Sequence, residues 1–131
     1  MGWPYGVAGP SCNQSNTNIL NHDFTHRTHM EIFNQTYYPT ELTDWYMDDW
    51  ISHTYGHTRT KQVASTGILH HTTSQSVRYY VDFYRGEYLE DLIEKGKGRI
   101  VKCMKARGLS QKEIETFEAS VFHNFTIEVI N

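Results

Sequence analysis

Residues 44–50 read Asp44-Trp45-Tyr46-Met47-Asp48-Asp49-Trp50, a pair of adjacent carboxylates among aromatic side chains. Adjacent carboxylates repel one another and tryptophan lowers the local dielectric, so the pKa of one carboxyl group is expected to rise. A carboxyl group with a raised pKa suits a general base. Alternatively, the pair caps a helix, since aspartate is favoured at helix starts and its charge suits the dipole. Both interpretations stay open on the pair alone.

The segments on either side of this pair predict alternating helices and strands. A helix is expected from Asp44 or Asp48 through Tyr55, ended by Gly56, because glycine commonly terminates helices. Residues 63–69 alternate and are partly β-branched, which predicts a strand leading into His70 and His71.

Glycine and proline dominate the N-terminal segment. Residues 1–22 are expected to form a loop, or a short strand followed by a loop. A helix is expected over 25–33, with Thr25 as its possible N-cap. If it extended backward, His22, His26 and His29 would share one face at a spacing that could bind zinc. No cysteine or carboxylate nearby completes such a site, so zinc is disfavoured.

The C-terminal third is predicted to be mainly helical. Residues 87–105 have the apolar periodicity of a long amphipathic helix. A division into two helices at Gly96 and Gly98 is the alternative. Residues 107–108 should end the helical segment.

A second helix is expected near the C-terminus. Ser110 and Glu113 have the spacing of a capping box for a helix over 111–119. Residues 125–130 alternate like a strand, although a frayed terminus is the alternative.

Composition restricts the class of protein. The 131 residues suit one domain, and the net charge of −3 gives no electrostatic footprint for nucleic acid. The two cysteines form no disulfide framework, and reduced thiols are slightly favoured. No apolar run reaches the roughly 18 residues of a membrane span. Sequons at Asn13, Asn34 and Asn124 could carry glycans in a secretory lumen.

Five short motifs follow one another in an order known from one enzyme class: 6–10, 26–33, 37–39, 48–52 and 70–72. Together, over about residues 6–77, they resemble the C-terminal half of a nucleotide-sugar glycosyltransferase with the GT-A fold. The resemblance implies an α/β, Rossmann-like partial GT-A fold. Residues 1–85 would form its acceptor-side half, and residues 86–131 a helical extension of the same domain.

The resemblance also implies roles for individual residues. Asp49 would be the catalytic base and Asp48 would hold an acceptor hydroxyl. His70 or His71 would coordinate a metal, with Mn²⁺ favoured over Mg²⁺ because manganese accepts imidazole more readily. The residues implied to bind substrate are Gly6, Gly9, His29, Trp45 and Trp50.

One part of the family pattern is missing. The Asp-x-Asp motif that holds metal and sugar nucleotide does not occur before residue 48. We therefore expect a fragment or the distal half of a split enzyme. Its partners would be a nucleotide-sugar donor and a glycan or glycoprotein acceptor, in the Golgi or secretory lumen if the full-length enzyme is eukaryotic. The alternatives are a non-catalytic carbohydrate- or protein-binding module, or an inactive fragment.

Overall fold

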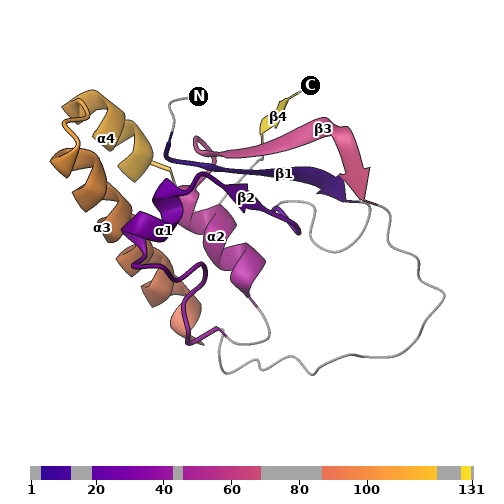
Figure 1. Cartoon of the computed structure of the whole chain (residues 1–131), viewed down its shortest axis with the longest axis horizontal. Helices are drawn as coiled ribbons and strands as arrows, with labels where there is room; N and C mark the ends of the chain where they lie inside the picture. The colour runs from indigo at the N-terminus through magenta and orange to yellow at the C-terminus, as the bar shows by residue number, and fades with distance from the viewer. Residues whose placement is uncertain (1–3, 13–18, 43–45, 69–86, 121–127, 131) are drawn as a thin grey trace.

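The computed structural model describes residues 4–12, 19–42, 46–68, 87–120 and 128–130, and Figure 1 shows their arrangement. Within these residues the strands form one four-stranded sheet in the order β2-β1-β3-β4. β1 is parallel to β3, β3 is parallel to β4, and β2 is antiparallel to β1. The strands are β1 (Val7–Cys12), β2 (Phe24–Thr25), β3 (Thr60–Ile68) and β4 (Glu128–Ile130).

Helices connect the parallel strands. α1 (Thr28–Ile32) and α2 (Met47–Tyr55) lie between β1 and β3 in the sequence. α3 (Leu89–Ala106) and α4 (Gln111–Glu118) lie between β3 and β4. Parallel neighbours require long crossovers of this kind, usually helical. The α/β class expected from the sequence is therefore confirmed.

The core lies where α2 packs between the sheet and α3 (Figure 1). α3 is one continuous helix, so the predicted long helix is confirmed and the alternative of a division at Gly96 and Gly98 is wrong. A Cβ atom on Gly96 would lie 2.8 Å from Cγ2 of Thr54, whereas one on Gly98 would meet nothing within 4 Å. Gly96 thus permits the close approach of α3 to α2. The largest fully buried side chains include Trp50, Tyr5, Tyr55, Phe117, Leu20, Ile51, Ile100 and Met104.

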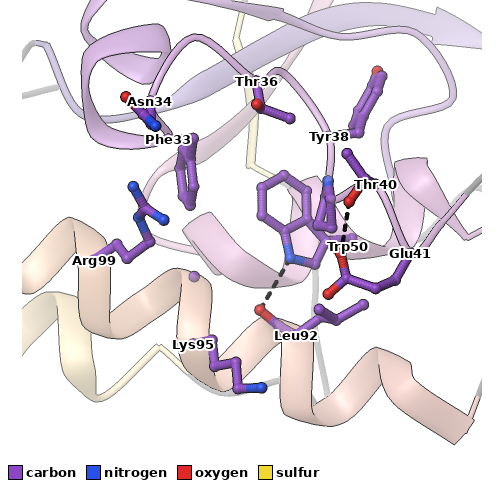
Figure 2. A pocket seen from close by; sticks show the side chains of 12 residues that line it. Phe33, Asn34, Thr36, Tyr38, Thr40, Glu41, Trp50, Leu92, Lys95 and Arg99 are labelled. Atoms are coloured by element: carbon purple, nitrogen blue, oxygen red, sulfur yellow. Dashed lines mark hydrogen bonds between the residues drawn. The ribbon is translucent and has the colours of Figure 1, made fainter.

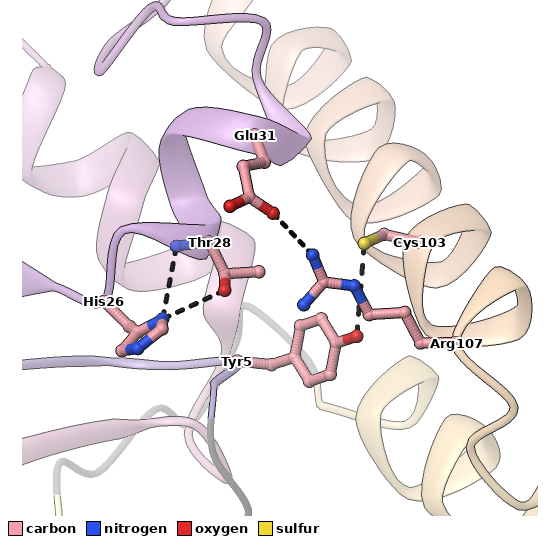
Figure 3. A network of polar contacts seen from close by, with 6 residues as sticks. All are labelled: Tyr5, His26, Thr28, Glu31, Cys103 and Arg107. Atoms are coloured by element: carbon pink, nitrogen blue, oxygen red, sulfur yellow. Dashed lines mark hydrogen bonds and ion pairs between the residues drawn. The ribbon is translucent and has the colours of Figure 1, made fainter.

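The start of α1 differs from the expectation. Thr25 belongs to β2, and the helix begins only at Thr28. Nδ1 of His26 accepts the backbone N–H of Thr28 at 3.2 Å, which satisfies a donor that the first turn leaves unpaired (Figure 3). Because the chain is not helical at His22 and His26, they do not share a helix face with His29. The zinc-binding spacing therefore does not form.

Polar contacts link the N-terminal segment and α1 to α3 (Figure 3). Arg107 pairs with Glu31 at the surface, where an ion pair contributes little to stability. The Tyr5 hydroxyl lies 4.0 Å from Sγ of Cys103, which is a free thiol. The side chain of Cys12 lies outside the described part of the chain.

Several local predictions are confirmed. α2 ends before Gly56, whose φ of 74° is the left-handed conformation that glycine tolerates. Ser110 and Glu113 form the expected capping box. β3 is a strand as expected, although it begins at Thr60. In the segment over 1–22, the expectation of a short strand is confirmed by β1.

β4 joins the main sheet beside β3, so the C-terminal third combines two helices with a strand. The boundary at residue 85 lies outside the described residues and stays a prediction. Within the described residues, no helix has both the length and the apolarity to cross a membrane.

Candidate functional site

Asp48 and Asp49 lie in the first turn of α2. The N-cap is Tyr46, which has a left-handed φ of 69° and makes no side-chain cap bond. Oδ1 of Asp48 accepts the backbone N–H of Asp49 at 3.0 Å. Neither aspartate is therefore the N-cap. The two carboxyl groups also hydrogen-bond to one another, so they form a coupled pair in the first turn of α2.

Burial and mutual repulsion raise the proton affinity of this pair. Burial, followed by the charge of Asp48, raises the pKa of Asp49 to about 6. Burial also raises the pKa of Asp48, although the backbone N–H of Asp49 opposes that rise. A half-buried carboxyl group of this kind can accept a proton near neutral pH. The pair thus has the electrostatics expected of a general base.

A third carboxylate lies beside the pair. Asp23 accepts the hydroxyl of Tyr37 at 2.6 Å and that of Tyr38 at 2.7 Å. After burial, the charge of Asp23 also contributes to the raised pKa of Asp48. Burial is likewise the largest cause of the raised pKa of Tyr38, to which the charge of Asp48 adds. We call these five residues the carboxylate cluster. It combines side chains from the segment before β2, the loop after α1, and α2.

His29 lies behind the cluster rather than in it. Its ring is 1% exposed. Nε2 lies 2.7 Å from the carbonyl oxygen of Tyr37, and Nδ1 lies 2.8 Å from the hydroxyl of Tyr55. Both ring nitrogens are therefore engaged within the protein, and the histidine positions the backbone of Tyr37. A direct role of His29 in substrate binding stays a prediction from the sequence.

The other residues expected to bind substrate occupy three different environments. Trp50 is 1% exposed and donates its indole N–H to the carbonyl of Leu92 at 3.1 Å. Gly6 is buried just before β1. Gly9 lies within β1, where a Cβ atom would be only 2.0 Å from the carbonyl oxygen of His22. The close approach at Gly9 is thus to the protein's own backbone.

Trp45, His70 and His71 lie outside the described residues, so their predicted roles are untested. Within the described ranges, no three His, Cys, Asp or Glu side chains are grouped so that they could hold a metal ion. The carboxylate cluster offers carboxyl groups that can accept a proton and two phenols that donate to Asp23.

The interpretation of the sequence missed Asp23, Tyr37 and Tyr38 as members of the site. Asp23 stands in a segment without periodicity, and the motif over 37–39 contributes to the resemblance without a role for its tyrosines. The adjacent tyrosines were the one available signal, because buried phenols require a hydrogen-bond partner. Nothing local identified that partner.

The chain gave no match to known protein families, to curated proteins or to solved structures.

Proposed function

We propose that the chain is the acceptor-side part of a nucleotide-sugar glycosyltransferase in which Asp49 is the general base. The observation that carries the proposal is the half-buried Asp49 carboxyl group beside Asp48, with its pKa raised to about 6. A base with this pKa is mostly ionised at neutral pH yet has an appreciable proton affinity. The order of motifs along the sequence supports the same enzyme class.

The proposed reaction is a displacement at the anomeric carbon of the donor. The acceptor hydroxyl oxygen bonds to that carbon while its proton passes to a carboxylate oxygen of Asp49. The bond from the carbon to the nucleoside diphosphate breaks, and the diphosphate leaves with the bonding electron pair. Asp48 is held by the backbone N–H of Asp49 and positions the acceptor hydroxyl.

Hydrogen bonds in the cluster support this assignment. The hydroxyls of Tyr37 and Tyr38 both donate to Asp23, which fixes a negative charge beside Asp48. That charge raises the pKa of Asp48, and the charge of Asp48 in turn raises the pKa of Asp49, the proposed base. A divalent cation, Mn²⁺ in preference to Mg²⁺, would neutralise the leaving diphosphate. Its expected ligands His70 and His71 are tested by single alanine substitutions and Mn²⁺-dependent donor binding.

The test is a transfer assay on the protein in its full natural form, with a panel of nucleotide sugars and release of the nucleoside diphosphate as readout. Asp49→Asn preserves shape but cannot accept a proton, so turnover should fall roughly 10²-fold or more. Glu90→Gln, an exposed first-turn acid on α3, is the control and should leave turnover unchanged. Full turnover by Asp49→Asn would show that the base is another group. Donor or glycan binding without turnover by the wild type would favour the non-catalytic module.

A further inference from the structure

A cavity of about 280 Å³ lies between α3 and the loop that follows α1 (Figure 2). Its volume is near the lower end of ligand pockets, about 300 Å³, which suits a ligand of one ring with short substituents. Trp50 lines the cavity and directly follows Asp49 in the sequence. Tyr38 also lines the cavity, while its hydroxyl donates to Asp23. The cavity therefore adjoins the carboxylate cluster and shares Tyr38 with it.

The inner wall is apolar and aromatic. Phe33, Trp50 and Leu92 are all buried, and Gly96 adds no side chain. The Phe33 and Trp50 rings meet edge to face with centroids 5.2 Å apart, which gives the wall a rigid shape. Such a wall favours the C–H faces of a ring over a hydrated ion.

Polar groups surround the opening (Figure 2). Thr36, Thr40 and Glu41 come from the loop, and Arg99 and Lys95 come from α3. Thr40 donates its hydroxyl to Glu41 at 3.1 Å, which orients the carboxylate. Hydroxyl and carboxylate groups on one side can bind ligand hydroxyls, while the cations opposite can bind an anion.

Arg99 is the better anion contact of the two cations. Its Nε donates to the carbonyl of Ile32 at 3.0 Å, and its Cζ lies 5.7 Å from the centroid of the Phe33 ring. These contacts orient the guanidinium and leave its two terminal nitrogens for a bidentate partner. Lys95 is already paired with Asp91 at 2.9 Å.

We infer that this cavity binds a monosaccharide-sized ring that carries one anionic group, with the ring against the aromatic wall and the anion on Arg99. The shared chemistry is that of an acidic sugar, whose charge is either a carboxylate or a phosphate. Binding of such a ligand in this cavity does not depend on the glycosyl transfer proposed above.

The first experiment measures binding to the full chain by calorimetry and ¹H–¹⁵N NMR. The probes are glucuronate, glucose 6-phosphate, glucose and inorganic phosphate. At least one of the two acidic sugars should bind more tightly than both glucose and phosphate, and should shift the Arg99 Nε–H and Trp50 indole N–H signals. Which acidic sugar binds more tightly identifies the source of the anion. Equal binding of inorganic phosphate, or no acidic sugar binding tighter than about 1 mM, would overturn the inference.

The second experiment compares variants. Arg99→Gln should weaken binding of the acidic sugar by about tenfold or more, and Arg99→Lys should restore only part of it, because lysine lacks the planar fork. Lys102→Gln, at an exposed cation on α3 outside the cavity lining, should change nothing. Unchanged affinity in Arg99→Gln would overturn the assignment. Thermal unfolding shows whether Arg99→Gln is folded. The binding of the four probes to the wild type tests the inference without this variant.

A third comparison separates this site from the proposed base. Asp49→Asn should retain binding of the acidic sugar with wild-type affinity, whereas Arg99→Gln should retain the raised pKa of Asp49. If Asp49→Asn abolished binding, the ligand would occupy the carboxylate cluster and the cavity assignment would be wrong.

Discussion

Nδ1 of His29 lies 2.8 Å from the hydroxyl of Tyr55, and this contact joins α1 to the last turn of α2. The carbonyl of Tyr37 can only accept a hydrogen bond, so Nε2 of His29 carries the proton. Burial lowers the pKa of His29, which favours the neutral ring. Nδ1 is then an acceptor, and Tyr55 donates to it. A buried chain of three groups thus supports the loop that carries Tyr37.

Substituting His29 by Phe should destabilise the fold by on the order of 2 kcal/mol, because the Tyr55 hydroxyl and the Tyr37 carbonyl lose their partner. Tyr55→Phe alone should also destabilise, since Nδ1 loses its donor. The double variant should lose less than the sum of the single changes, because no polar atom of that pair remains unpaired. Denaturant unfolding of the four proteins measures the coupling. Strictly additive losses would show that the contact contributes nothing specific.

Asp49→Asn should stabilise the protein at neutral pH while it removes the base. The folded-state pKa of Asp49, about 6, lies above its ordinary value of 3.8, so the folded state binds the proton more tightly. In the wild type, the contribution of Asp49 to the free energy of unfolding is fully present below pH 3.8 and is lost as the pH rises through about 6. The gain in the variant above pH 6 should be on the order of 1–2 kcal/mol, since water reaches the half-buried carboxyl group.

The measurement is the difference between the unfolding free energies of wild type and Asp49→Asn from pH 4 to pH 8. Both proteins keep His29, whose lowered pKa has the opposite effect as pH falls below about 6.5, and the subtraction removes it. Glu90→Gln should give a flat difference over the same range. A flat difference for Asp49→Asn as well would mean that its pKa is not raised in the fold.

Gly96 and Gly98 offer a matched pair within one helix. Alanine at position 96 would place Cβ 2.8 Å from Thr54 Cγ2 and 3.3 Å from Trp50 Cζ2, so α2 and α3 would have to separate. We expect Gly96→Ala to destabilise by about 1–3 kcal/mol, the usual cost of overpacking. Gly98→Ala meets nothing within 4 Å and should stabilise by about 0.5–1 kcal/mol through helix propensity. Thermal unfolding distinguishes the two signs, and stabilisation by both would contradict the packing of α3 on α2.

Features set by neighbouring residues were predictable from the sequence. Gly56 ends α2 and Ser110 with Glu113 caps α4, because these signals act over one helical turn. The close approach of α3 to α2 at Gly96 was not predictable, since it depends on Thr54, far away in the sequence. The short strand β2 was missed for the same reason, because pairing with β1 defines its two residues.

In the candidate site, too, features set by adjacent residues were predictable and features set by distant residues were not. The unusual electrostatics of Asp48 and Asp49 followed from their adjacency and aromatic surroundings. The contribution of Asp23 did not, because the hydroxyls that hold it belong to Tyr37 and Tyr38 after an intervening helix. The cavity beside Trp50 is likewise formed by two segments that meet only in the folded chain.

The parallel pairing of β3 with β4 has a consequence for how the chain acquires its fold during synthesis. Lys61 pairs with Glu128 and Val63 with Ile130, so one side of β3 has no β4 beside it until residues 128–130 have been synthesised. Contacts between such distant residues form slowly, and an unpaired strand edge can recruit other chains in the meantime. Aggregation of the nascent protein should therefore be sensitive to changes in Glu128–Ile130, which form β4.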